Sequence, residues 1–246
     1  ITKKKNALPT TQRTKMAEAK EDKAEFDWPP LESNPDIFTD YMRKIGLSAE
    51  FIIGEVFGFD EELLAFLPQP IHAIIVAVDR RSRAEDRQKG SPENSSLVEF
   101  YMDQSGTLDN ACGIIACIHA SLNTPVEIAP GSILGKFHAE NADKTPAERC
   151  KSLEENTEFK SHHKDYAMSG QSAPVTNDQS KVNHHFIAFV VKNGMLIELD
   201  GTKKGPVIIE SECDDVLRGS IKEIQRRLDN GEISDKLSMM TLSAAQ

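Results

Sequence analysis

Cys112 stands between a polar stretch, residues 109–111, and a run of apolar residues. The apolar side chains recur at the spacing of one buried helix face: Ile114, Ile115, Ile118 and Leu122. We expect Asp109 or Asn110 to cap this helix, which places Cys112 in its first turn. Unpaired backbone N–H groups and the helix dipole favour an anion there, including the nucleophilic thiolate form of cysteine. The pattern makes Cys112 a candidate nucleophile, and a buried core thiol is the alternative.

A catalytic cysteine needs a general base, and the base needs a third group that orients its ring. Asn-Gly at 193–194, between two β-rich runs, predicts a hairpin of residues 185–191 and 195–200. In the register that this turn sets, His185 and Asp200 share a face and lie about 7–8 Å apart on a diagonal. His184 points to the opposite face. The register selects His185 as the base and Asp200 as its orienter, and a strand-end histidine beside a turn aspartate is the alternative.

A thiol that attacks a carbonyl carbon also needs hydrogen-bond donors for the oxyanion that forms. The backbone N–H of Cys112 is one candidate donor. The side-chain amide of Gln104, at the end of the preceding predicted strand, is a second, and an exposed polar residue at a strand terminus is the alternative. The other histidines are expected to be structural or solvent-facing: His72, His119, His138, His162 and His163.

The elements that must position these residues alternate between helices and strands. Besides the Cys112 helix, apolar periods and cap residues predict helices at 34–45, 60–66, 132–138, 146–155 and 211–228. Besides the hairpin, β-rich runs predict strands at 51–57, 71–78, 97–102 and 237–242. Residues 71–78 are almost all apolar, which indicates a strand buried on both faces. Residues 156–181 have few aliphatic side chains and no period, so we expect a long functional loop.

Composition argues against several classes of protein. The formal net charge of −10 disfavours nucleic-acid binding, and no apolar run approaches the roughly 18–20 residues of a membrane span. The four cysteines lack the paired spacing of a disulfide framework or a zinc site, which favours a reducing, intracellular compartment. Residues 1–26 are charged throughout and predict a polar N-terminal tail before a domain at 27–246. The first residue is Ile, so we expect a fragment or a processed chain.

Ordered motifs through most of 27–245 resemble the ubiquitin carboxyl-terminal hydrolase family of cysteine deubiquitinases (peptidase family C12), in particular its small single-domain members. The motifs are Trp28-Pro29-Pro30-Leu31-Glu32-Ser33-Asn34-Pro35, Phe57-Gly58-Phe59-Asp60, Asn110-Ala111-Cys112-Gly113, Lys181-Val182-Asn183-His184-His185-Phe186-Ile187-Ala188, Glu198-Leu199-Asp200-Gly201 and Leu242-Ser243-Ala244-Ala245. By this resemblance Cys112 matches the family nucleophile, His185 the general base and Asp200 the residue that orients it.

The resemblance also implies a fold and a restriction on substrates. The fold is α/β (α+β) and papain-like, with a central, mostly antiparallel sheet flanked by helices and a knotted backbone. Residues 27–246 form the catalytic domain, and the loop at about 156–181 matches the family's active-site crossover loop. That loop limits leaving groups to small adducts or flexible chains. No metal and no cofactor are expected.

The oxyanion glutamine is where this chain departs from the family pattern. The family glutamine lies six residues before the nucleophile, and this chain has Gly106 there. Gln104 follows Tyr101-Met102-Asp103 as the family glutamine follows its own strand, so we infer an insertion of Ser105-Gly106 and assign Gln104 to the oxyanion hole. By resemblance, the contacts to ubiquitin are Pro30, Leu31, Glu32, Asn34, Pro35, Gly170, Gln171 and Leu237.

The sequence therefore predicts a deubiquitinating thiol hydrolase that cleaves esters, thioesters, amides or peptide bonds after the C-terminal Gly of ubiquitin. The expected partner is ubiquitin, with no nucleic acid and no membrane, and the expected enzyme is a monomer in the cytoplasm or also in the nucleus. One alternative is a ubiquitin-binding module that has lost catalysis because Ser105-Gly106 displaces the glutamine. Another is a hydrolase that also acts on a ubiquitin-like modifier.

Overall fold

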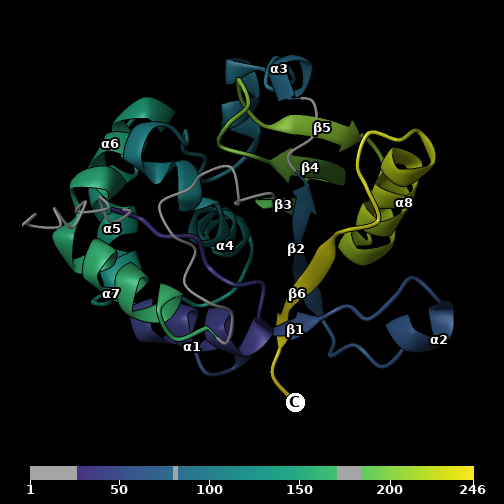
Figure 1. The fold of residues 1–246 in the computed structure, drawn as a ribbon, viewed down its shortest axis with the longest axis horizontal. Helices are drawn as coiled ribbons and strands as arrows, with labels where there is room; N and C mark the ends of the chain where they lie inside the picture. The colour runs from purple at the N-terminus through teal and green to yellow at the C-terminus, as the bar shows by residue number, and fades with distance from the viewer. Residues whose placement is uncertain (1–26, 80–82, 171–183) are drawn as a thin grey trace, which may run out of the picture.

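A six-stranded antiparallel sheet runs through the middle of the molecule, with helices on both of its faces (Figure 1). The computed structural model describes residues 27–79, 83–170 and 184–246. The strand order is β1 (Phe51–Glu55), β6 (Ser238–Ala244), β2 (Ile71–Asp79), β3 (His184–Lys192), β4 (Met195–Leu199) and β5 (Val207–Glu210). Each neighbouring pair is antiparallel. The predicted α/β class and antiparallel sheet are therefore confirmed, and β5 is a strand that the sequence pattern did not predict.

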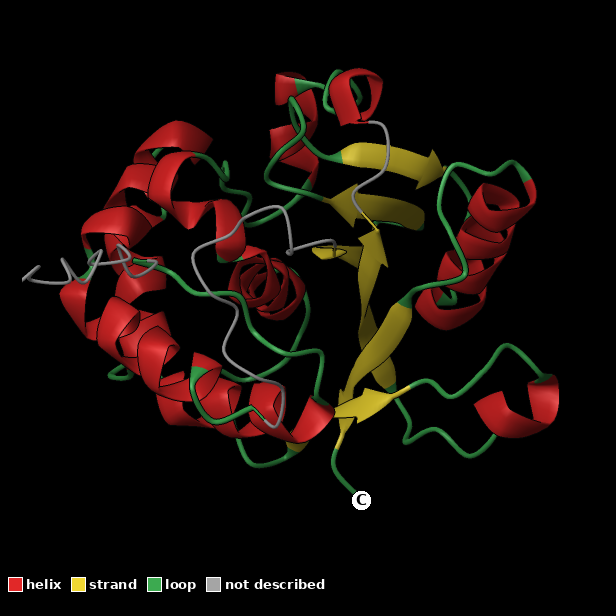
Figure 2. Cartoon of the chain, viewed as in Figure 1, coloured by secondary structure: helices red, strands yellow, loops and turns green. Residues whose placement is uncertain are grey.

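The helices fall into two groups on opposite sides of the sheet (Figure 2). One side carries α1 (Pro35–Ile45), α4 (Cys112–Leu122), α5 (Ile133–Asn141), α6 (Pro146–Glu155) and α7 (Thr157–Ala167). The other side carries α8 (Val216–Asp229) and the short α2 (Glu61–Leu64). The connections include α3 (Arg83–Asp86) and two 3₁₀ helices, η1 (Pro92–Leu97) and η2 (Gly106–Asn110). In the described parts of the chain, no helix has both the length and the apolar character needed to cross a membrane.

The central strand β2 separates two apolar cores. Its alternate side chains Ala73, Ile75 and Ala77 join the core around α4, while Ile74 and Val76 join the core around α8. Because successive side chains of a strand point to opposite faces, a strand with cores on both sides must be apolar at nearly every position. The predicted burial of this strand on both faces is confirmed.

Local signals placed several element boundaries correctly. The side chain of Asn34 accepts hydrogen bonds from the backbone N–H groups of Asp36 (3.0 Å) and Ile37 (3.4 Å) and so caps α1. Gly46, at φ 131°, ends the same helix in a conformation that side chains disfavour. Helix α6 has the bounds predicted for it. Helix α8 begins at Val216 rather than at 211, because the carboxylate of Asp215 caps it.

The strand predicted at 97–102 is wrong. Its backbone lies against α4, and side chains of that helix and its C-cap accept the N–H groups that a neighbouring strand would otherwise bind. Asn123 Oδ1 accepts from the backbone of Glu99 (2.8 Å) and Phe100 (3.0 Å), and His119 Nε2 accepts from Met102 (3.1 Å). Leu97 ends η1 and Val98 is extended, and the backbone that follows has side chains rather than a strand as its partners.

The loop predicted at 156–181 is wrong over its first part, where α7 lies. The side chain of Asn156 accepts from Phe159 N–H (2.9 Å) and begins the helix. Phe159 and His163, one helical turn apart, are both fully buried. Aromatic side chains thus supply the buried face that aliphatic residues supply elsewhere. Residues 171–181 of the predicted loop lie outside the described residues.

Thr39 joins α1 to the edge strand β1. Its buried hydroxyl donates to the carbonyl of Ile53 (3.1 Å) and accepts from the N–H of the same residue (3.0 Å). We expect Thr39→Val to lower the free energy of unfolding by about 2 kcal/mol, because both backbone groups lose their partner. Urea denaturation measures this, and Thr39→Ser, which keeps the hydroxyl, should cost clearly less. Equal stability of Thr39→Val and the wild type would contradict this assignment.

Candidate active site

Cys112 is the first residue of α4, and the predicted first-turn position is confirmed. The cap is Ala111 rather than Asp109 or Asn110, so that part of the prediction is wrong. The reason is that 109–110 belong to η2, whose last turn closes with a hydrogen bond from Ala111 N–H to the carbonyl of Leu108 (2.9 Å). Every residue of α4 is buried, so the helix crosses the interior between the sheet and the other helices (Figure 2).

Gly113 allows the start of α4 to sit deep in the core. A Cβ at this position would lie 2.9 Å from Phe38 on α1 and 3.4 Å from Leu31. Any larger residue would therefore push α1 and the 28–31 segment away from the cysteine. Phe38 and Leu31 pack closely at this end of α4, and the sheet lies on the other side of Cys112.

His185 and Asp200 form the predicted pair across the hairpin. The observed register pairs Lys192 with Met195 and Ala188 with Leu199, so the predicted register is confirmed. His185 Nε2 donates to Asp200 Oδ1 at 2.7 Å, and the two side chains are only 1% and 3% exposed. His184, by contrast, is exposed and lies opposite Asp79 of β2.

The electrostatics of this pair favour a charged imidazole ring. Burial alone would lower the pKa of His185, but the charge and hydrogen bond of Asp200, with those of Cys112, raise it to about 9. Burial opposes ionisation of Asp200 as well, yet the neighbouring His185 charge holds the pKa of its carboxyl below the usual value. The pair is therefore an imidazolium and a carboxylate at neutral pH.

The hydrogen bond from Nε2 to Asp200 also orients the second ring nitrogen of His185, Nδ1. Nδ1 is buried. The side chain of Cys112 is the neighbouring group that interacts with the same ring. Because Asp200 holds Nε2, the ring presents Nδ1 to other groups, and a thiolate beside an imidazolium is an activated nucleophile.

The turn after β4 is tied down so that Asp200 keeps its position. Thr202 donates to Asp200 Oδ1 from its backbone N–H (3.0 Å) and its hydroxyl (2.8 Å). The Tyr101 hydroxyl donates to the backbone carbonyl of Asp200 (2.8 Å). Neither residue is predicted above to support the site; Thr202 has a sequence signal, because a polar residue two positions after Asp commonly closes an Asx turn.

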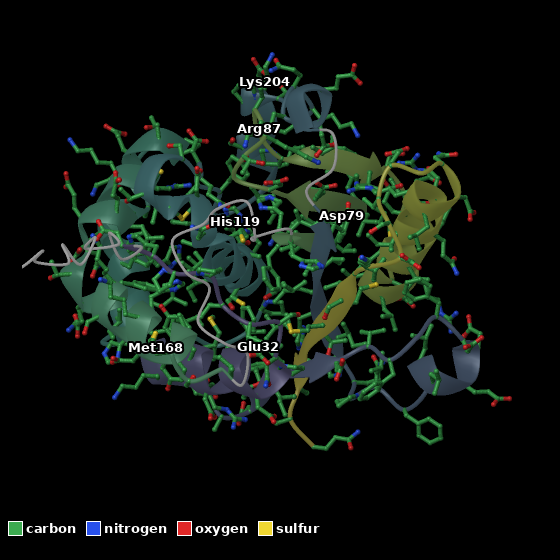
Figure 3. The ribbon with its side chains drawn as sticks, viewed as in Figure 1. Glu32, Asp79, Arg87, His119, Met168 and Lys204 are labelled. Carbon is green, nitrogen blue, oxygen red and sulfur yellow. The ribbon has the colours of Figure 1, made fainter. Side chains whose placement is uncertain are left out.

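His119 is a buried core residue, as the sequence pattern predicts. Its ring stacks on Tyr101 with centroids 5.2 Å apart and accepts the Met102 N–H, and Figure 3 shows it in the interior. Burial lowers the pKa of His119 to about 4, so the ring is neutral and serves as an acceptor. His163 is likewise buried, and its ring nitrogen Nε2 lies 2.7 Å from the carbonyl of Pro29. Neither histidine competes with His185 for the role of base.

Gln104 is buried next to the Asp200 turn. Its backbone N–H donates to the carbonyl of Gly201 (2.7 Å). Its side-chain Nε2 donates to the carbonyls of Leu108 (3.2 Å) and Asp109 (3.1 Å), both in η2. The structure thus places the amide against the 3₁₀ turn that leads directly into Cys112, with its donors engaged by backbone oxygens.

The Ser105-Gly106 dipeptide, which we infer to be an insertion, lies next to α6. Gly106 has φ 63°, and the next residue, Thr107, donates its hydroxyl to Glu154 Oε1 (2.6 Å). Ser105 Oγ lies 3.6 Å from Cys150 Sγ on the same helix. Ser105 is the N-cap of η2 and Gly106 is its first residue, so the start of η2 lies against α6.

The segments predicted to contact substrate lie together although they are far apart in sequence. Ser33 donates to the hydroxyl of Ser238 (2.9 Å), which joins 30–35 to the residue after Leu237. A Cβ on Gly170 would lie 2.6 Å from the carboxylate of Glu32. Gln171 lies outside the described residues.

Within this surface the individual residues differ in exposure. Leu31 is buried, so it supports the surface from below. Asn34 and Pro35 begin α1, which gives both a structural role. Pro30 and Leu237 are half-buried. Among the described residues, no group of three or more His, Cys, Asp or Glu side chains is placed to hold a metal ion.

Comparisons with known proteins find the same similarity over most of the chain. The sequence profile of "Ubiquitin carboxyl-terminal hydrolase, family 1" matches residues 28–229. A ubiquitin carboxyl-terminal hydrolase of Drosophila melanogaster is 34% identical over 231 residues, which cover 89% of this chain and 98% of that protein. Ubiquitin carboxyl-terminal hydrolase 3 of Arabidopsis thaliana is 31% identical, over 93% of this chain and 99% of its own length.

A solved structure is similar in fold over nearly the whole described chain. The UCH37 catalytic domain of Trichinella spiralis, bound to ubiquitin vinyl methyl ester, superimposes with a TM-score of 0.72 at 25% identity. The superposition covers 91% of this chain and 98% of that domain.

Proposed function

The chain belongs to the ubiquitin carboxyl-terminal hydrolase family, and from that premise we propose that Cys112, His185 and Asp200 are its catalytic residues. It is a deubiquitinating thiol hydrolase that cleaves after the C-terminus of ubiquitin. The observation that carries the residue assignment is the buried hydrogen bond of 2.7 Å between His185 and Asp200, with Cys112 acting on the same ring at the N-terminus of α4.

The reaction proceeds in two halves. The Cys112 thiolate attacks the carbonyl carbon of the C-terminal Gly, and the oxyanion that forms is stabilised by the backbone N–H of Cys112 and by Gln104. His185 then gives its proton to the leaving group, and the C–N or C–O bond breaks to leave a thioester. Neutral His185 next takes a proton from water, the hydroxide attacks the thioester, and the thiolate leaves.

For Gln104 to stabilise the oxyanion, one of its side-chain N–H groups must leave its present acceptor. Its amide now binds the carbonyls of Leu108 and Asp109, and an amide has two N–H donors in all. We expect an N–H to turn from η2 to the oxyanion as the intermediate forms. Gln104→Met, which keeps a similar length and removes both donors without adding a charge, is the variant that tests this contribution.

The activity should fall as the pH rises through about 9. The pKa of His185 is raised to about 9 in the free enzyme, so the imidazolium that pairs with the thiolate persists below that pH and is lost above it. We expect kcat/KM for a ubiquitin C-terminal fluorogenic amide to have its basic limb there. A basic limb near 6.5, the ordinary value for histidine, would contradict the assignment of His185.

Ubiquitin that carries a thiol-reactive group at its C-terminus tests the nucleophile directly. We expect a one-to-one covalent adduct, seen by intact mass, with the modified peptide containing Cys112. Cys117→Ala is a matched control, because Cys117 is also buried on α4 and should not affect labelling. An adduct on any other cysteine would refute the assignment. Binding without an adduct would instead support the alternative of a module that has lost catalysis.

Several finer properties complete the proposal. Residues 27–246 form the catalytic domain and 1–26 a tail, supported by the fully buried Trp28 at the start of the domain. Ubiquitin binds across the 30–35, 170–171 and 237 segments. Leaving groups are small or flexible, as the family resemblance implies through its active-site crossover loop. The knotted backbone, the monomeric state and the cytoplasmic or nuclear location stay predictions, as does action on a ubiquitin-like modifier.

A further inference from the structure

A second buried carboxylate lies beside the catalytic pair. Glu198 is on β4, two residues before Asp200, so both side chains point to the same face of the sheet. Glu198 is completely buried. Two buried like charges at this spacing disfavour each other's ionised form, unless cations balance them.

Two buried cations provide that balance. Lys203 Nζ binds one carboxylate oxygen of Glu198, and Arg227 of α8 binds the other. The Lys203 side chain is 1% exposed and that of Arg227 is 8% exposed. Arg227 is shared, because its Nε also binds Glu223 on the preceding helical turn (2.6 Å). Lys203 is therefore the one of these two cations that comes from the turn containing Asp200.

Lys203 and Asp200 belong to one tight turn. The Lys203 backbone N–H donates to the Asp200 carbonyl (3.0 Å), and the Tyr101 hydroxyl donates to the carbonyls of both residues (2.8 Å for Asp200 and 3.2 Å for Lys203). A lysine side chain rarely has no contact with water, since its desolvation costs free energy unless the charge is paired. Its burial behind the catalytic carboxylate thus needs an explanation beyond packing.

We propose that Lys203 is a positioning residue of the hydrolysis, which acts through Asp200. Its buried ammonium offsets the negative charge of Glu198 and Asp200 that acts on His185 and Cys112, and so sets the pH range in which the thiolate–imidazolium pair exists. The inference rests on the proposed role of Cys112, His185 and Asp200. The directions of the pKa shifts agree with it, because Lys203 lowers the pKa of both carboxyls against the effect of burial.

Other charged residues also lie close to Glu198 and the His185–Asp200 pair. A polar cavity of about 370 Å³ is lined in part by Glu198, His185 and Asp200. Around it stand Asp79 of β2, Glu85 and Asp86 of α3, Lys89, His185, Asp200, Arg227 of α8 and Glu232. Asp86 is 3.3 Å from Lys203 Nζ but is partly exposed, so its effect is screened. Removal of Lys203 leaves an excess of negative charge that Arg227 alone does not neutralise.

The segment after α3 holds the turn in place from outside. Lys204 N–H donates to the Lys89 carbonyl (3.2 Å), and Figure 3 shows Lys204 close to the α3 segment at the edge of the molecule. A Cβ on Gly205 would overlap the carbonyl of Ser91, so the two backbones are in direct contact. The backbone of the turn is thus fixed without the Lys203 side chain, and its charge can be changed separately.

The test is the pH dependence of kcat/KM for a ubiquitin C-terminal amide. Lys203→Met keeps the length of the side chain but removes its charge. We expect both limbs of the profile to move to higher pH by about half a unit or more, because the unbalanced negative charge favours the imidazolium and disfavours the thiolate. Lys203→Arg, which restores the charge, should return the limbs toward the wild type. Lys222→Met, which breaks the exposed pair with Glu210, is the matched control and should move neither limb.

Glu198→Gln provides an independent test with the opposite sign. It leaves Lys203 and Arg227 with excess positive charge, so both limbs should move to lower pH, whether or not Lys203→Met folds. Suppose that Lys203→Met or Glu198→Gln folds and has a lower melting temperature, but both limbs of its pH profile stay where the wild type has them. This result would overturn the proposal. That result is distinct from a failure of the catalytic assignment, in which the wild-type enzyme would not be labelled at Cys112.

Discussion

Replacing Cys112 with Ala should lower kcat for a ubiquitin C-terminal fluorogenic amide by at least about 10⁴-fold. The thiolate forms the covalent intermediate, and without it His185 and Asp200 have no nucleophile to activate. Only the sulfur atom is lost from a buried site, so the fold and the affinity for ubiquitin should be nearly unchanged. Binding is measured by calorimetry and turnover by fluorescence on the same preparation.

Cys117→Ala is the matched control for this prediction. Cys117 is buried on the same helix, and burial raises the pKa of its thiol well above the ordinary value, so it stays protonated. The substitution removes the same atom from a comparable environment and should keep kcat within about twofold. Full turnover by Cys112→Ala would show that the chemistry belongs to another residue.

The two adjacent histidines should differ strongly in their effect. We expect His185→Ala to lower kcat by about 10³- to 10⁴-fold, because it removes both the proton donor for the leaving group and the base for water. His184→Ala should retain most of the activity, since His184 is exposed and points away from Asp200. The pair of variants tests the strand register as well as the chemistry.

Stability needs a control here, because His185→Ala leaves the buried carboxylate of Asp200 without its main partner. His185→Gln retains an amide donor toward Asp200 and should fold more stably, with turnover still lost. If instead His184→Ala lost turnover and His185→Ala kept it, the assignment of the base would be reversed.

Local sequence rules were sufficient where a feature depends on neighbours in the chain. Asn34, Pro35 and Gly46 define α1, because caps and turns act on backbone groups within a few residues. The Asn-Gly turn at 193–194 has positive φ at both residues, and with the period of a strand it sets the face of His185 and Asp200. The pairing of His185 with Asp200 could therefore be predicted before any packing was known.

Predictions from the sequence pattern were wrong where a side chain distant in the sequence binds the backbone groups that a neighbouring strand would otherwise bind. The 97–102 segment has strand-forming residues, but Asn123 and His119 accept its N–H groups. The sequence of α7 was predicted to be a loop, because the buried face of this helix is aromatic rather than aliphatic. Those aromatic rings find partners only in the tertiary structure, where His163 packs on Trp28 at 5.0 Å between ring centroids.

The sequence by itself determined the place of Cys112 at a helix start and the place of His185 and Asp200 on one hairpin face, and it predicted the family. Only the tertiary structure decided that the Cys112 side chain meets the His185 ring, that Gln104 is engaged by η2, and that Lys203 is buried against Glu198. The physical reason is that backbone dihedrals and side-chain faces are properties of a few consecutive residues. Burial and charge pairing instead depend on which distant segments pack together, and a lysine in a turn carries no local sign that its charge is enclosed.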